Sequence, residues 1–128
     1  MREILFRGKC TNDSKNRGKW AEGYLLRFTE KRNPFIMLKD GGGECAEVIL
    51  ESVGQYTGLT DKNGTKIFEG DVVNILTENN EIGIVKYDEG GFGVEADGFV
   101  IDFRRNIDGT DVEVIGNIYD NPELLKGV

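Results

Sequence analysis

The sequence of 128 residues contains no histidine. Imidazole is the usual general base near neutral pH and the commonest zinc ligand, so Ser-His-Asp and Cys-His catalysis are excluded and only carboxylate chemistry remains open. The two cysteines, Cys10 and Cys45, do not form a Cys-x-x-Cys pair. We expect two reduced thiols rather than a zinc site. The sequence therefore predicts a protein that is not an enzyme and that holds no metal and no cofactor.

Long apolar runs and prolines are also scarce. No stretch approaches the roughly eighteen apolar residues that span a bilayer. The three apolar residues between charges in residues 1–7 are too few for a signal peptide, so we expect a cytoplasmic protein without membrane contact. Eighteen glycines against two prolines indicate many short reversals, and no stretch keeps a helical apolar period. The expected fold class is all-β.

Short apolar or alternating segments between turn residues mark the expected strands. Residues 2–9 and 20–28 are predicted to form an N-terminal β-hairpin. Further strands are expected at residues 35–38, 45–50, 55–59, 66–68, 72–76, 82–87, 92–96, 99–103 and 111–118. Pro122, behind Asp120 or Asn121 as cap, begins a short C-terminal helical turn. We expect Leu124 and Leu125 of this turn to close one open end of a curled sheet.

Residues 53–73 organise this pattern. Asn63-Gly64 suits the two central, positive-φ positions of a type I′ turn, so residues 55–59 and 66–68 are predicted to run antiparallel. A second reversal at Glu69-Gly70-Asp71 leads into the next strand. Three extended segments within about twenty-five residues are enough to seed a small closed roll.

Charge is unevenly distributed along the chain. Residues 1–39 contain ten Lys or Arg and four Asp or Glu, whereas residues 40–128 contain six and nineteen, so the net charges are +6 and −13. Either the two parts face each other, within one chain or between copies, or the basic part binds a polyanion. The acidic part would repel nucleic acid unless it faced away, so protein contacts are the favoured interpretation.

Several ordered motifs follow one another along the chain. They are Gly54-Gln55-Tyr56-Thr57-Gly58-Leu59, Asp61-Lys62-Asn63-Gly64, Ile67-Phe68-Glu69-Gly70-Asp71-Val72-Val73, Val114-Ile115-Gly116-Asn117-Ile118-Tyr119 and Asn121-Pro122-Glu123-Leu124-Leu125. Together they resemble one known family, the YopX family. The opening Phe-Arg-Gly of residues 6–8 and the Trp-x-x-Gly-Tyr-Leu of residues 20–25 are similar to the family as well. The resemblance thus touches both ends and the middle of the chain.

The resemblance implies a small bacteriophage or prophage protein of the bacterial host cytoplasm, with an SH3-like barrel and no established activity. We expect one domain over residues 1–128, with a basic N-terminal β segment at 1–50 and an acidic SH3-like barrel segment at 51–128. The family supplies no catalytic or binding residues. Leu50 stands where the family often has proline, so the local bend before Val53 is not predicted.

The candidate interaction surface consists of basic residues on polar loops, with one tryptophan nearby. We expect these loops to converge at one end of the sheet. The residues are Lys15, Arg17, Lys19, Trp20, Arg27, Lys31 and Arg32. In a nucleic-acid-binding protein they would contact phosphates, and in an assembly they would meet the acidic part of a neighbour.

The motif aromatics and carboxylates are the remaining candidates. Tyr56, Phe68 and Tyr119 are expected in the barrel wall; if they line an open groove instead, they would hold a peptide or stacked bases. Asp61, Glu69 and Asp71 would form a metal or acid–base site only if two of them met in a cleft. Turn hydrogen bonds explain Asp61 and Asp71 without chemistry.

Together these patterns favour a non-enzymatic protein-interaction or self-assembling module. Its expected partner is another protein or a second copy of the chain, with no small-molecule cofactor. The alternative is weak nucleic-acid binding through the basic N-terminal loops.

Overall fold

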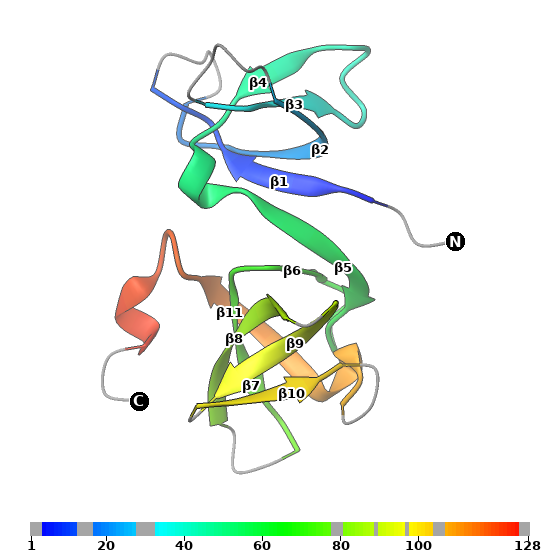
Figure 1. Ribbon diagram of the computed structural model, residues 1–128, viewed down its shortest axis with the longest axis vertical. Coiled ribbons are helices and arrows are strands. Elements are labelled where there is room, and N and C mark those ends of the chain that lie inside the picture. Colours follow the sequence, from blue (N-terminus) through cyan, green and yellow to red (C-terminus); the bar gives the residue numbers. More distant parts are fainter. Residues whose placement is uncertain are drawn as a thin grey trace. The chain divides into compact units, whose positions relative to one another are not determined.

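The computed structural model describes residues 4–12, 17–27, 33–77, 81–88, 90–96, 98–103 and 107–125. The chain forms two compact units, Met1–Tyr56 (unit 1) and Thr57–Val128 (unit 2). Strands dominate both units, and the helical elements in the described ranges are short 3₁₀ turns, as Figure 1 shows. The predicted all-β fold class is confirmed. The described part of the chain contains no helix with the length and hydropathy that a membrane crossing requires.

Unit 1 is a meander of four strands followed by the start of a fifth. Its elements are β1 (Phe6–Lys9), β2 (Trp20–Leu26), β3 (Phe35–Leu38), β4 (Cys45–Glu47), the 3₁₀ turn η1 (Leu50–Ser52) and the first part of β5 (Gly54–Thr60). The strand order of this sheet is β4-β3-β2-β1-β5-β6. The antiparallel register of β1 and β2, with Lys9 opposite Trp20, confirms the predicted N-terminal hairpin.

The core of unit 1 lies on one face of these strands. Alternate residues point to the same face of a strand, and the buried set Cys10, Ala21, Ile36, Ala46 and Val48 follows that alternation. An isolated bridge between Cys10 and Val48 brings the chain after β4 back to the end of β1. The four strands therefore curl around this core.

The predicted strand at residues 45–50 is too long, because β4 ends at Glu47 and the chain then turns through η1. Ser52 holds this turn: its hydroxyl donates to the Ile49 carbonyl at 2.6 Å and accepts from the Lys9 amide at 2.8 Å. A buried serine thus supplies the bend at Leu50, where the family often has proline.

Unit 2 contains the remaining strands. They are β6 (Lys66–Phe68), β7 (Asp71–Ile75), β8 (Glu81–Asp88), β9 (Gly91–Ala96), β10 (Phe99–Asp102) and β11 (Val112–Asn117), with the 3₁₀ turns η2 (Gly109–Asp111) and η3 (Pro122–Leu125). The second sheet has the order β10-β9-β8-β7-β11. The predicted short C-terminal helical turn is therefore present as η3.

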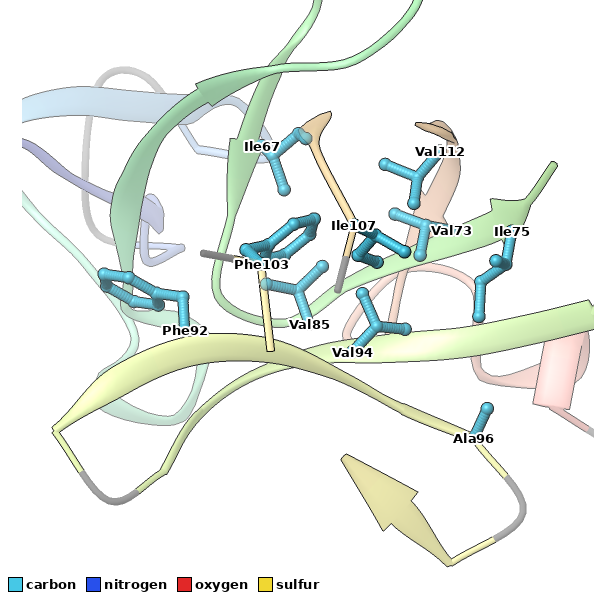
Figure 2. Close-up of a cluster of buried hydrophobic side chains, with 10 residues drawn as sticks. All are labelled: Ile67, Val73, Ile75, Val85, Phe92, Val94, Ala96, Phe103, Ile107 and Val112. Carbon is cyan, nitrogen blue, oxygen red and sulfur yellow. The ribbon is translucent and has the colours of Figure 1, made fainter. Parts of the chain in front are cut away.

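The core of unit 2 is larger and consists of aliphatic side chains with two phenylalanines. Val85 lies opposite Val94 across the β8–β9 pair, and Val73 lies opposite Val114 across β7–β11. Figure 2 shows how side chains from these strands and from the loops point toward one another. The set consists of Ile67, Val73, Ile75, Val85, Phe92, Val94, Ala96, Phe103, Ile107 and Val112.

The predicted closed barrel is not found among the described residues, where β4 and β6 end one sheet and β10 and β11 end the other. The outer edge of β11 shows why pairing stops there. Its Val114 amide donates to the Asp61 carboxylate at 2.9 Å, and its Val112 carbonyl accepts from the Lys62 amide at 3.2 Å. A turn, not another strand, occupies these edge groups.

The central turn is also built differently from the sequence prediction. The Gly64 amide donates to the Asp61 carbonyl at 3.0 Å, so Lys62 and Asn63 are the central residues of the turn and Gly64 follows them. Gly64 has φ of +82°, a conformation that glycine adopts without steric cost. The type I′ assignment of Asn63-Gly64 is therefore wrong, although the β5–β6 reversal is present at this position.

The C-terminal turn does not close a barrel end. A Cβ placed on Gly116 of β11 would lie 2.7 Å from Leu124 Cδ1 and 2.7 Å from Asn121 Oδ1, so η3 packs onto the strand itself. The Asn121 amide donates to the Asn117 carbonyl at 2.8 Å, and the Asn117 amide donates to Asn121 Oδ1 at 3.2 Å. These reciprocal bonds hold the reversal that brings Leu124 onto Gly116.

Candidate functional site

The outer face of β1 and β2 carries two cations, Arg7 and Lys9, and the tryptophan of unit 1. Because directly opposed residues share a face, Lys9 and Trp20 lie side by side, and Arg7 lies beside Glu22. The Cys10 amide donates to the Lys19 carbonyl at 2.9 Å. Counting from that bond, the Lys9–Trp20 and Arg7–Glu22 pairs are non-hydrogen-bonded pairs, in which side chains approach most closely.

Two cations consequently flank one indole. The Arg7 guanidinium lies 4.9 Å from the centroid of the Trp20 ring, and the Lys9 ammonium lies 6.0 Å from it. Both distances fall within the range of cation–π attraction, which contributes about 0.5–1 kcal/mol at exposed sites. Arg7, Lys9 and Trp20 are called the basic face below. Two further exposed cations, Arg17 and Lys19, lie in the turn that leads into Trp20.

The structure separates the basic residues that the sequence places together. Arg17 and Lys19 precede β2, whereas Arg27 follows it, and all three are exposed. Seven strand residues span roughly 20 Å, so Arg27 does not converge with the other two. The remaining predicted positions, Lys15, Lys31 and Arg32, lie outside the described residues.

Sequence reasoning missed Arg7 and Lys9 as neighbours of Trp20. Both belong to the predicted N-terminal strand, and the strand period alone puts them on one face. Only the register of β1 against β2 places that face beside Trp20. The sequence signal that could have found them is their spacing of two residues on a strand that is predicted to form a hairpin with the strand beginning at Trp20.

The three motif aromatics do not form one groove. Tyr56 and Phe68 are 8% and 5% exposed to solvent, whereas Tyr119 is 40% exposed. The first two rings are therefore buried in the fold and are not available to stack on a peptide or a base. Tyr119 lies just after β11, where its amide donates to Asn117 Oδ1 at 3.0 Å.

Asp61 is a structural carboxylate. It is 2% exposed, and its Oδ1 accepts from the amides of Asn63 at 2.8 Å and Thr65 at 2.9 Å, while its Oδ2 accepts from Val114. Burial raises the pKa of this carboxyl, but the three backbone donors, helped by nearby Lys62, outweigh burial and lower it overall. Both oxygens are engaged in holding the turn on β11.

The other two candidate carboxylates also belong to a turn. Asp71 is 1% exposed, and its Oδ2 accepts from the Phe68 amide at 2.8 Å, which closes the reversal between β6 and β7. Glu69 lies within that reversal and is partly exposed. Among the residues that the structure describes, no group of three or more Cys, Asp or Glu side chains is arranged to hold a metal ion.

Unit 2 exposes apolar side chains on its last strands. On β10, Phe99 is 75% exposed and Val100 is 42% exposed. Val100 lies over Gly93 of β9, where a Cβ would come within 2.7 Å of Val100 Cγ1. Near the end of β11, Ile115 and Ile118 are 39% and 43% exposed.

Two solved structures are similar to this chain over nearly its whole length. Protein EF1440 from Enterococcus faecalis has a similar structure, with a TM-score of 0.58, 24% identity, and coverage of 98% of this chain and 100% of that chain. Protein yopX from Bacillus subtilis superimposes with a TM-score of 0.53 at 18% identity, covering 100% of this chain and 99% of that one. These likenesses show a shared fold. No protein of curated function matches the sequence.

The family resemblance seen in the motifs is confirmed. The family model described as YopX protein matches residues 6–126. This range includes most of both units, the turn at residues 61–64 and the C-terminal motif at residues 121–125. The protein therefore belongs to the YopX family.

Proposed function

We propose that this protein is a non-enzymatic interaction module that binds a protein partner or a second copy of itself. We place it among bacteriophage or prophage accessory proteins that act in the cytoplasm of the bacterial host. The family likeness of the motifs supports that setting, and the exposed strand surfaces of unit 2 support the contact function.

We further propose an SH3-like arrangement for unit 2. Strands β7 to β10 form an antiparallel meander, the 3₁₀ turn η2 follows, and β11 returns to pair with β7. Such small barrels host many unrelated functions. The fold thus says little about the partner, and the surface has to be argued separately.

Phe99 and Val100 on β10 are the observation that carries the proposal. A single exposed apolar side chain is ordinary, but here two consecutive residues, one on each face of the strand, are exposed on β10. In the described part of the chain β10 is the last strand at one edge of its sheet. Fully burying a phenylalanine side chain contributes about 1.5–3 kcal/mol. A partner that covers this edge would be stabilised by the burial of Phe99, and it would shield the edge strand from non-specific pairing with other strands.

The backbone of β10 supports the same conclusion. The Phe103 amide donates to the Phe92 carbonyl at 3.2 Å, and Val100 lies three residues earlier on the alternating ladder. By that alternation the N–H and C=O of Val100 point away from β9. An extended segment of a partner can therefore add hydrogen bonds at Val100 while it covers the apolar side chains.

Charge favours a basic partner surface for unit 2. Residues 57–128 contain six Lys or Arg and fifteen Asp or Glu, a net charge of −9, whereas residues 1–56 contain ten and eight, a net charge of +2. Opposite charge accelerates association and sets its salt dependence. A second copy offers such a surface in its N-terminal part.

Light scattering after size exclusion, at low and high salt, tests the self-association. We expect a concentration-dependent increase in mass that Phe99→Ser reduces and that Leu50→Ser, a change at a 38% exposed residue of unit 1 outside β1 and β2, does not. A parallel pull-down from lysogenic cells would compare the proteins retained by the two variants. A monomer at all salt concentrations, with the same proteins retained by Phe99→Ser and the unmodified chain, contradicts the proposal.

A further inference from the structure

We infer that the basic face of unit 1 binds single-stranded nucleic acid, with Trp20 as the stacking platform. This surface is made of other residues than those of β10 and goes beyond the protein contacts proposed above. It consists of Arg7 and Lys9 of β1 and Trp20, the first residue of β2.

The first step of the argument is the chemistry at Trp20. Non-specific single-strand sites combine cations that follow the phosphate backbone with aromatic rings on which bases stack. Here the Arg7 guanidinium and the Lys9 ammonium lie 4.9 Å and 6.0 Å from the same indole. A base can stack on the indole or on the guanidinium plane while the neighbouring phosphate meets Lys9.

The face continues along β2 beyond this cluster. Tyr24 is four residues after Trp20 on the same face, and it is 45% exposed. Four strand residues span about 13 Å. Met37 of β3 lies opposite Tyr24 and is partly exposed. The sheet therefore presents a second ring within reach of a strand that begins at Trp20.

The local charge fits a polyanion although the whole chain is acidic. The basic face holds two cations, two more (Arg17 and Lys19) lie in the turn that leads into it, and Glu22, opposite Arg7, is the acidic residue on the same strands. At physiological ionic strength exposed charges more than about 8 Å apart are largely screened, so the charges beside the ligand count most. An acidic protein surface would also pair with the cations, but the bases of a single strand stack on exposed rings while its phosphates meet the cations, so we favour a nucleic acid.

The sequence contains a single tryptophan, so its fluorescence reports on this face alone. We would titrate the protein with an oligothymidylate of about twenty nucleotides, longer than one typical single-strand site, and follow both Trp20 quenching and the anisotropy of an end label. We expect saturable quenching and an affinity that falls steeply with salt. Trp20→Leu, followed by anisotropy, should weaken binding about tenfold or more without changing the salt slope.

Charge variants separate this face from general attraction. Lys9→Gln and Arg7→Gln should each weaken binding and reduce the slope of log K against log salt by about 0.7. Arg27→Gln is the matched control, because Arg27 is exposed but lies at the other end of β2, and it should leave affinity and slope unchanged. If Trp20→Leu fails to fold, as judged by circular dichroism, the charge variants and the quenching of unmodified Trp20 still decide the question.

Three results would overturn the inference. The first is no quenching by the oligothymidylate at low salt. The second is equal binding and equal quenching by heparin, which would make the face a polyanion site without base recognition. The third is a salt-dependent dimer that Lys9→Gln abolishes while oligothymidylate binding is unaffected, which would make the face a contact between copies.

Discussion

Replacing Asp61 with asparagine should destabilise unit 2 far more than its surface-turn position suggests. The carboxylate lies 2% exposed at the junction of the β5–β6 reversal and β11. It accepts three backbone N–H groups, from Asn63, Thr65 and Val114. Asparagine has nearly the same shape, so the variant changes the charge and one acceptor and leaves the packing volume unchanged.

The expected loss follows from these bonds. The amide oxygen of asparagine can still accept from Asn63 and Thr65, but its NH₂ group then faces the Val114 amide, donor against donor. A hydrogen bond to a charged group is worth about 1.5–3 kcal/mol, and a buried donor without an acceptor costs about 1–3 kcal/mol. We therefore expect the free energy of unfolding to fall by about 2–4 kcal/mol, out of a total of about 5–15 kcal/mol for a typical domain.

Urea unfolding followed by circular dichroism measures the global effect, and amide hydrogen exchange at Val114 measures the local one. Each 1.4 kcal/mol of lost protection should accelerate exchange about tenfold. Asp40→Asn is the control, because it removes the same charge from an exposed turn of unit 1 and should shift stability by no more than about 0.5 kcal/mol. If Asp61→Asn unfolds within that margin, or if Val114 exchange is unchanged, the carboxylate does not hold the turn on β11.

Three further predictions follow from the same geometry. The folded-state pKa of Asp61 is lowered. Its contribution to stability is therefore complete above the ordinary carboxyl pKa of about 3.9 and is lost as the pH falls through the lower folded pKa. Below about pH 4, the free energy of unfolding should depend less steeply on pH for Asp61→Asn than for the unmodified chain. Gly23→Ala should strongly destabilise unit 1, since its Cβ would overlap the carbonyl oxygen of Met37 across the β2–β3 pair, and thermal unfolding close to that of the unmodified chain would contradict the packing. Gly64→Ala meets no atom within 4 Å but keeps φ of +82°, so its cost in a urea titration should be about 1 kcal/mol, from backbone conformation alone.

The strands were largely predictable because their signals are local. The segments at residues 35–38 and 66–68 agree with β3 and β6 at both ends, since each is a short apolar run bounded by turn residues. Errors cluster where a tertiary contact ends an element. Strand β4 stops at Glu47 because Ser52 ties the following turn to Lys9, and no pattern within residues 45–50 encodes that bond.

The candidate surface divides in the same way. The basic character of the N-terminal part and the presence of Trp20 can be counted from the sequence, and Arg17 and Lys19 are indeed exposed beside β2. The spatial arrangement of these residues could not be predicted in this way. The hairpin register places Arg7 next to Trp20, and the length of β2 places Arg27 far from it. The functional role of this surface stays a prediction.

By itself, the sequence determined the all-β class, the succession of strands along the chain and membership in the family. Side-chain alternation and turn residues act over a few neighbours, so they can be read without a structure. Tertiary structure alone decided that Asp61 reaches Val114 across 53 residues, that β10 and β11 end their sheet in the described part of the chain, and that two cations meet at one indole. Those features depend on register and packing between distant segments, which no local pattern specifies.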